Sequence, residues 1–189
     1  MFDVLLKESR MLCPVCKTVT LANEDLQQNL TAKTCKQCGG RWLPSYQYWK
    51  WLDKHGATLP EKPIDAGLSL PVDDSPAGKV CPECGHFLSR KRVGHGIDFH
   101  LDRCNNCGGL WFDLNEWEVL LSRNLHDEVH FVFSSAWQKQ VQRDDAKHVQ
   151  AERLEKILGH EDYAKMIEIA GWIRSHPNKS TILSYLAEK

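Results

Sequence analysis

The chain has 189 residues, of which 42% are hydrophobic and 26% are charged, and its formal net charge is -1. This composition is typical of globular proteins and excludes a chain that is disordered throughout. No segment approaches the roughly 18 apolar residues that a membrane-spanning helix needs, and the first residues lack the pattern of a secretory signal.

The eight cysteines all fall into Cys-x-x-Cys pairs, and none is left over. Eighteen residues separate the first pair from the second, and nineteen separate the third from the fourth, in the order Cys13/Cys16, Cys35/Cys38, Cys81/Cys84 and Cys104/Cys107. Two close pairs at this distance are typical of a zinc site with four thiolate ligands. We therefore expect two structural Zn²⁺ ions per chain, free thiols instead of disulfides, and a reducing compartment, the cytoplasm.

Residues 1–52 contain the first pair of knuckles and a short aromatic segment after them. Leu30 and Ala32 have the spacing of one face of a strand, and Ser45 is the best candidate to start a helix. We predict that Trp42 packs between the hairpin and this helix. The aromatic residues that crowd the helix are a candidate surface for binding another protein, and they comprise Tyr48, Trp49 and Trp51.

Residues 53–79 contain four prolines and carry a net charge of −2. A proline-rich, acidic segment of this kind predicts an extended linker between two domains. Because such a linker would separate the two zinc sites, we expect each site to lose its metal independently of the other.

Residues 80–125 repeat the first segment with clearer strand signals. Residues 87–93 and 97–103 are predicted to pair as a hairpin, since the second of these alternates apolar and polar side chains around a Gly-His-Gly turn. Asp113 with Glu116 has the pattern of a capping box, so a helix should follow. We predict that Trp111, like Trp42, packs between its hairpin and the following helix.

The phrase Cys-x-x-Cys-Gly-Gly-x-Trp occurs in both segments, at Cys35 and again 69 residues later at Cys104. The second segment, from Cys81 to Leu121, resembles the TFIIB-type zinc ribbon of many small bacterial proteins, and the first segment resembles it less closely. The resemblance implies that all eight cysteines are structural metal ligands. It also implies a link to transcription.

Residues 126–189 are predicted to be helical, with one long polar helix from near Ser135 to Gly159 and two shorter helices separated at Pro177. Their apolar residues exceed what two short helices can hide from water. We therefore predict a second partner-binding surface here, formed by Tyr163, Ile167, Trp172 and Ile173.

The predicted fold class is a small α+β protein with two tandem zinc ribbons and an all-α C-terminal extension. The ribbons are residues 1–52 and 80–125, each a hairpin plus a following helix, the linker is 53–79 and the extension is 126–189. The charge distribution gives +3 to residues 1–52 and small negative values elsewhere, and two zinc sites with four thiolates each bring the loaded protein to about −5.

Three functions fit these features. The preferred hypothesis is an adaptor or assembly factor that binds another protein and performs no catalysis. An alternative is a nucleic-acid or transcription-associated module that uses the basic cluster Arg90, Lys91 and Arg92, although the negative charge of the loaded protein disfavours general phosphate binding. A second alternative is thiol-redox chemistry.

Overall fold

The computed structural model describes residues 10–27, 29–56, 59 and 70–188. It divides into two compact units, which we call the ribbon unit, Met1–Val141, and the helical unit, Gln142–Lys189. Residues 57, 58 and 60–69 of the predicted linker lie outside the described residues. The boundary falls later than the predicted start of the extension at residue 126, because residues 126–141 pack against the ribbons.

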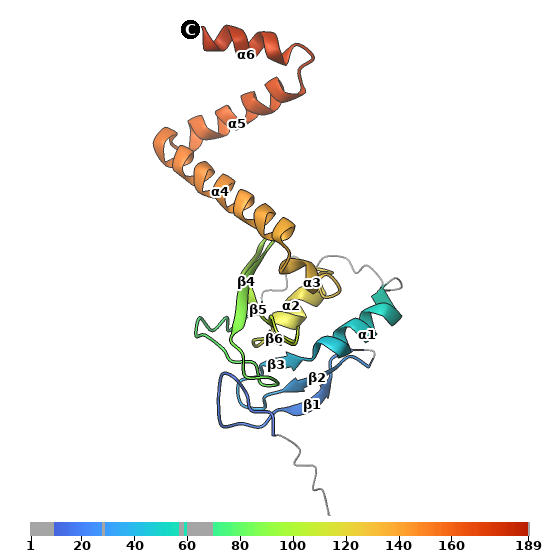
Figure 1. Cartoon of the computed structure of the whole chain (residues 1–189). Helices are drawn as coiled ribbons and strands as arrows, with labels where there is room; N and C mark the ends of the chain where they lie inside the picture. Colours follow the sequence, from blue (N-terminus) through green and yellow to red (C-terminus); the bar gives the residue numbers. More distant parts are fainter. Residues whose placement is uncertain (1–9, 28, 57–58, 60–69, 189) are drawn as a thin grey trace, which may run out of the picture. The chain divides into compact units, whose positions relative to one another are not determined.

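The described part of the ribbon unit contains one antiparallel sheet of six strands in the order β1-β2-β3-β6-β5-β4 (Figure 1). The first ribbon contributes one half of this sheet and the second ribbon contributes the other. The strands are β1 Ala22–Asp25, β2 Thr31–Thr34, β3 Arg41–Leu43, β4 Leu88–Gly94, β5 Ile97–Cys104 and β6 Leu110–Phe112. The predicted α+β fold class, with two zinc-binding halves and a helical C-terminal part, is confirmed.

The two ribbons join through β3 and β6, the short strands that the sequence analysis did not predict. Trp42 pairs with Trp111, and the flanking pairs are Arg41 with Phe112 and Leu43 with Leu110. Since Trp42 and Trp111 are equivalent in the repeat, the pairing is locally two-fold symmetric, as at an interface between two identical subunits. The expectation of independent ribbons therefore has to be corrected, because their central strands share backbone hydrogen bonds.

Alternation along the central strands gives the sheet two different faces. Leu43, Leu110 and Phe112 point into one apolar core, which also contains Phe99 and Leu101 from β5. The two central tryptophans belong to a second cluster, together with buried cysteines of both knuckle sets. One face of the sheet thus holds both metal sites, and the other holds the helices.

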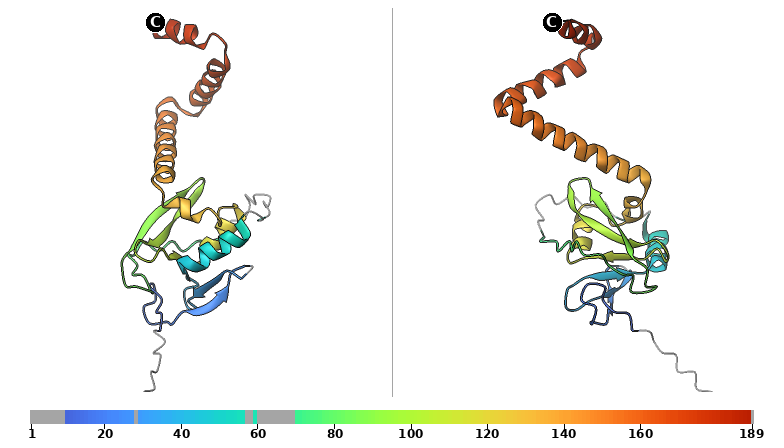
Figure 2. Two further views of the ribbon diagram at one scale, coloured as in Figure 1. Left: turned by 45° about the vertical axis from the view of Figure 1, so that its right-hand side comes forward. Right: turned by 60° about the vertical axis from the view of Figure 1, so that its left-hand side comes forward.

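Helices α1, Ser45–His55, and α2, Glu116–Ser122, cover the apolar face (Figures 1 and 2). They meet through Trp51 and Trp117, whose ring centroids lie 6.5 Å apart. A third short helix, α3 at Val129–Val132, seals this core with both of its valines. Tyr48 fixes it by donating a 2.7 Å hydrogen bond to the carbonyl of Asp127.

The remaining helices agree closely with the predicted ones. They are α4 Ser135–Leu158, α5 His160–Ser175 and α6 Lys179–Ala187. Helix α4 begins in the ribbon unit, where Val141 is buried and the Trp137 indole N–H donates to the Val93 carbonyl at 2.7 Å. Every helix among the described residues is too short or too polar to cross a membrane.

Candidate metal centres

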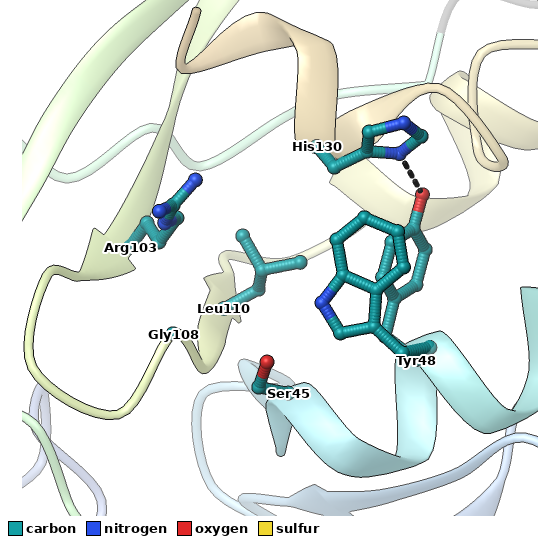
Figure 3. A pocket seen from close by; sticks show the side chains of 7 residues that line it. Ser45, Tyr48, Arg103, Gly108, Leu110 and His130 are labelled. Carbon is teal, nitrogen blue, oxygen red and sulfur yellow. Dashed lines mark hydrogen bonds between the residues drawn. The ribbon is translucent and has the colours of Figure 1, made fainter.

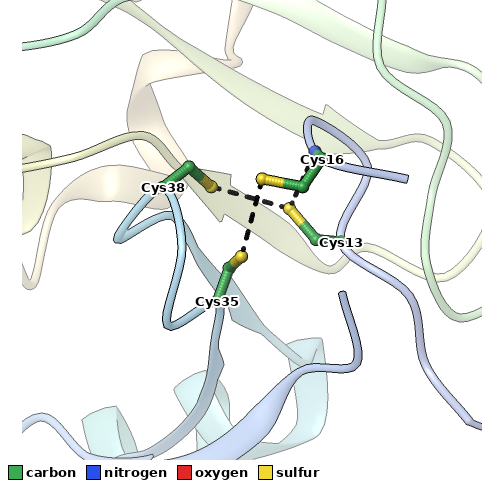
Figure 4. Close-up of side chains that lie close together, drawn as sticks. All are labelled: Cys13, Cys16, Cys35 and Cys38. Carbon is green, nitrogen blue, oxygen red and sulfur yellow. Dashed lines mark hydrogen bonds between the residues drawn. The ribbon is translucent and has the colours of Figure 1, made fainter. Parts of the chain in front are cut away.

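The first candidate metal centre brings together Cys13, Cys16, Cys35 and Cys38 (Figure 4). Cys13 Sγ lies 3.6 Å from Cys38 Sγ, and Cys16 Sγ lies 3.8 Å from Cys35 Sγ. One cysteine of each pair is buried and the other is partly exposed. The backbone N–H of Cys16 donates to Cys13 Sγ at 3.3 Å, which is the tight turn expected of a knuckle.

The second centre has the same construction from Cys81, Cys84, Cys104 and Cys107. Its corresponding sulfur distances are 3.6 Å for Cys81 to Cys107 and 3.4 Å for Cys84 to Cys104. The N–H groups of Glu83 and Cys84 both donate to Cys81 Sγ at 3.4 Å. The two centres are therefore copies in geometry as well as in sequence.

The distances between the sulfurs test whether zinc fits these sites. Four sulfurs at about 2.3 Å from a central Zn²⁺ in a tetrahedron lie about 3.8 Å from one another. The observed values, 3.4–3.8 Å, are close to this and far longer than the roughly 2.05 Å of a disulfide bond. Both sets of residues fit a structural Zn²⁺, which their four thiolates would hold with no coordination position left open.

The pKa values of the thiols show which cysteines must lose a proton when the metal binds. Burial raises the pKa of Cys13 and of Cys81 to about 11, and burial also raises the pKa of Cys38 and Cys107. The pKa of Cys84 falls to about 6, chiefly because the backbone N–H of His86 donates to its sulfur. Since a metal-bound cysteine is a thiolate, zinc binding must release protons from the buried thiols.

The repeated Gly-Gly-x-Trp phrase is explained by contacts between the ribbons. Each first glycine has a positive φ, 71° at Gly39 and 76° at Gly108, and so allows the knuckle to turn. A Cβ on Gly40 would lie 2.2 Å from a ring carbon of Trp111, and a Cβ on Gly109 would lie 2.1 Å from one of Trp42. Each tryptophan therefore packs on the backbone of the opposite ribbon, and not against its own helix as predicted.

Lys79, at the end of the predicted linker, is buried beside the second centre. Its ammonium group donates to Asp102 at 2.6 Å and to Asp113 at 2.8 Å, while Asp113 also accepts from the Trp111 indole at 2.7 Å. Burial lowers the pKa of Lys79, but its bonds to the two carboxylates outweigh this and the pKa is raised. Residues 70–79 are consequently anchored to the second ribbon, in contrast to the linker that was predicted.

The predicted capping box is only half formed. The Glu116 carboxylate accepts a 2.8 Å hydrogen bond from the backbone N–H of Asp113, as the pattern requires. The Asp113 side chain does not cap α2 because Lys79 and Trp111 occupy it. In the first ribbon, Ser45 is the first helical residue and forms no side-chain cap.

A third cluster of possible metal ligands adjoins this network. Its members are three carboxylates whose oxygens lie within 4.8 Å of one another, those of Asp74, Asp113 and Glu116. Two of these carboxylates already bind cations of the protein, because Asp113 binds Lys79 and Asp74 binds Arg90. This is the chemistry of a buried ion-pair network, and it gives no reason to add a metal.

The aromatic surface predicted on α1 is mostly core. Tyr48 and Trp51 are 1% and 3% exposed, because they point into the sheet face beneath the helix, so neither can form an open binding surface. Trp49 alone of the three is accessible, at 49%. Hydrophobic spacing on a short helix does not distinguish a binding face from a buried face when both are aromatic.

The residues predicted on the C-terminal helices differ in exposure. Ile167 and Trp172 are exposed, whereas Tyr163 and Ile173 of the same helix are half-buried. In the basic cluster, Arg90 binds Asp74 and Arg92 binds Asp98, while Lys91 is exposed.

Sequence reasoning missed Lys79 and Asp102, whose pairing depends on residues 70–79 folding back onto β5.

Two four-cysteine centres, each closed by a pair of knuckles on three antiparallel strands, define a tandem zinc-ribbon protein. A family model described as a transcription factor zinc-finger, the TFIIB-type zinc ribbon, matches residues 12–54 and again residues 80–123. These segments are two tandem TFIIB-type zinc ribbons, and the chain has two structural Zn²⁺ sites. Searches of curated proteins and of solved structures each find no match to this chain.

Proposed function

We propose that the protein is a non-catalytic adaptor or assembly factor, in which two zinc ribbons form a fixed body and the C-terminal helices bind another protein. The observation that carries this proposal is the exposure of large apolar side chains on α5 and α6. Neither helix has a buried residue, and the exposed side chains are Ile167, Ile169, Trp172, Leu183, Tyr185 and Leu186.

The physical argument rests on the cost of apolar surface in water. Each fully buried large apolar side chain contributes about 1.5–3 kcal/mol, so six that remain exposed forgo a large stabilisation. Large exposed apolar surfaces mark sites of protein association. Amphipathic helices commonly fill them by docking into a groove on a partner.

The metal centres support a non-catalytic role. In each centre four thiolates complete the tetrahedron, whereas a catalytic zinc keeps one position for water or substrate. The same closure argues against the thiol-redox alternative, because all eight cysteines are ligands. Eight free cysteines also favour a reducing compartment such as the cytoplasm.

The family description favours the nucleic-acid alternative, since it names a transcription factor zinc-finger. The basic cluster gives this alternative little support, because Asp74 and Asp98 neutralise two of its three cations. A protein partner within a transcription complex would satisfy both the family description and the exposed helices.

Co-purification from the native host tests the proposal. Tagged wild-type protein should retain a partner that the Ile167→Asp/Trp172→Asp variant loses, while both proteins contain two zinc ions. The control is Lys165→Gln, a polar change on the same helix that should retain the partner. The identified partner is then purified and its affinity for each variant measured.

Duplex DNA provides the competing arm of this experiment. We expect binding to DNA to be weak and to decline steeply as salt rises. Binding in the nanomolar range at physiological salt, together with unchanged protein capture by the double variant, would establish the nucleic-acid function in place of the adaptor.

A further inference from the structure

A small pocket of about 70 Å³ lies in the ribbon unit beside the second knuckle of the second ribbon (Figure 3). Its walls come from α1, β5, β6, the loop at Gly108 and α3. The polar groups on these walls are the Arg103 guanidinium, the Ser45 hydroxyl and the His130 imidazole, and Trp49 forms an exposed aromatic wall.

Arg103 is the unsatisfied group of this pocket. Its Nε is buried without a hydrogen-bond partner among the described residues, and none of their ion pairs includes Arg103. Its charged end lies 5.3 Å from the ring centroid of Phe133, which stabilises the cation but supplies no acceptor. Because a guanidinium keeps its charge at neutral pH, Arg103 is suited to bind an anion.

The repeat provides a reference for the missing group. Arg41 stands on β3 opposite Thr34 of β2, and Arg103 stands on β5 opposite Leu110 of β6. The two arginines thus occupy the same strand pair in the two ribbons, on opposite strands. Arg41 of the first ribbon forms a 2.7 Å ion pair with Glu118, which lies on α2 of the second ribbon.

The residue of α1 that corresponds to Glu118 is Trp49, 69 positions earlier in the repeat. Trp49 lines the pocket but offers no negative charge. Arg41 also binds Glu24 of β1 at 3.3 Å, so it has two carboxylate partners, whereas Arg103 has none among the described ion pairs. At the helix position the difference between the two ribbons is the aromatic Trp49 in place of Glu118.

A second departure from the repeat keeps the pocket open. Leu114 covers Gly39, and its terminal carbon lies 2.4 Å from where a Cβ on that glycine would be. The equivalent of Leu114 is Ser45, whose short side chain covers Gly108 and places a hydroxyl at the wall. The space filled by leucine in one ribbon is thus available in the other.

The groups around Arg103 decide which anion fits. Tyr48 donates its hydroxyl hydrogen to the Asp127 carbonyl and lies 3.1 Å from His130 Nδ1, so it has no hydrogen to offer a ligand. Burial lowers the pKa of His130, so the imidazole is neutral at neutral pH and adds no second cation. One guanidinium and one hydroxyl match a single negative charge better than the two charges of phosphate.

The size of the pocket limits how much of the ligand can enter. Since a water molecule takes about 30 Å³ of liquid, 70 Å³ holds a group of about two or three heavy atoms, such as a carboxylate. The rest of the ligand must remain outside, against the exposed ring of Trp49. A chain that carries a carboxylate on a short arm has this shape.

We propose that the Arg103 pocket binds a carboxylate of a partner polypeptide, with Arg103 as the anchor, Ser45 as a hydrogen-bond donor and Trp49 as the outer wall. This inference deepens the proposed adaptor function and rests on it. It defines a second contact, on the ribbon unit, for an acidic side chain or a chain-terminal carboxylate.

Titration of the zinc-loaded, ¹⁵N-labelled full chain tests the proposal through the Arg103 Nε–H and Trp49 indole resonances. The probes are N-acetylaspartate N-methylamide for an acidic side chain, N-acetylglycine for a chain terminus, and inorganic phosphate. We expect saturable shifts with one or both carboxylate probes at roughly millimolar affinity, and at least tenfold weaker binding of phosphate. The probe that binds more tightly shows whether the natural ligand is an acidic side chain or a chain terminus.

Two variants separate the pocket from general electrostatics. Ser45→Leu should abolish the shifts while it keeps the Arg103 charge, because it reproduces the filled arrangement of the first ribbon. Arg103→Gln should also abolish the shift of the Trp49 indole, which is the signal that this variant retains. Lys91→Gln, which removes an exposed cation on β4, should leave both signals as in the wild type. Absence of saturable carboxylate binding to the wild type, or equal binding to Ser45→Leu, would overturn the proposal.

Partner capture distinguishes this inference from the proposed function. If Arg103→Gln with two zinc ions binds the purified partner as tightly as wild type, the carboxylate pocket is refuted and the adaptor function stands. A loss of affinity of tenfold or more with Arg103→Gln and with Ser45→Leu supports both.

Discussion

Single atoms decide how closely the two ribbons approach. Gly40 and Gly109 have no side chain, and this allows the Trp111 and Trp42 rings to lie on the backbone of the opposite ribbon. A methyl group at either position would meet a ring that the sheet and the metal knuckles already hold on both sides. The glycines are therefore needed for the contact between ribbons, and one methyl group tests this.

We predict that Gly109→Ala lowers the free energy of unfolding of the zinc-loaded protein by about 1–3 kcal/mol, the usual cost of overpacking a core. Denaturant unfolding measures this change. Gly78→Ala is the matched control, because a Cβ there would meet nothing within 4 Å. Equal stability of the two variants would show that the Trp42 ring can move aside.

Glu116 makes stability depend on pH. Burial, followed by repulsion from Asp113, raises the pKa of its carboxyl well above the ordinary value of 4.5. The folded protein thus keeps a proton that the unfolded chain releases. The stability that this proton provides is complete below the unfolded pKa and is lost as pH rises through the folded pKa.

Glu116→Gln keeps the acceptor for the Asp113 N–H but removes this titration. We expect the variant to gain stability over the wild type as pH rises above about 4.5, by at most about 1.4 kcal/mol per pH unit. Urea unfolding of the zinc-loaded proteins between pH 5 and 8 measures the difference, in which the cysteine contributions cancel. Glu168→Gln, an exposed change on α5, should give a constant difference. A constant difference for Glu116→Gln would refute the assignment.

At the scale of elements, β3 and β6 connect the two metal sites. Each is three residues long, and each receives part of its backbone pairing from the other ribbon. A ribbon that loses its metal also loses the order of its central strand, so its neighbour loses hydrogen bonds and the contact of one tryptophan. Metal binding at one site should consequently stabilise the other.

We predict that Cys104→Ser weakens both sites, although it removes a ligand from only one. Elemental analysis should show at most one zinc per chain, and the remaining zinc should pass to a competing chelator at least tenfold faster than from the wild type. Cys35→Ser should have the reciprocal effect. Release from the intact site at the wild-type rate would restore the view of the ribbons as independent.

At the scale of the whole molecule, the metal ligands are confined to one of the two units. All eight cysteines lie between residues 13 and 107, and the helical unit begins at Gln142. Small cores of this kind depend on metal for much of their folding free energy. The helical unit contains no cysteine.

Removal of zinc should therefore unfold the ribbon unit alone. In amide hydrogen exchange with a strong chelator, we expect protection of β2, β3, β5 and β6 to fall by at least a hundredfold, while exchange in α5 and α6 stays within twofold. Two equivalents of Zn²⁺ should restore the first pattern. Parallel loss in both units would mean that the helices depend on the folded ribbons.

The sequence by itself determined the local features of this protein. The eight ligands, the strand that became β5 and the ends of α4 and α5 follow from short-range patterns: Cys-x-x-Cys spacing, alternation, and helix breakers at Gly159 and Pro177. These signals suffice because ligand geometry, pleat and helix termination act over a few residues.

Only the tertiary structure decided what the local features contact. Tyr48 and Trp51 became core, Lys79 became a buried cation and Arg103 became the anchor of a pocket because of chain segments distant in sequence. The pairing of β3 with β6 turned two copies of one phrase into a single sheet. The repeat shows that two similar units exist, but the packing of each tryptophan on the opposite glycine depends on steric fit between them.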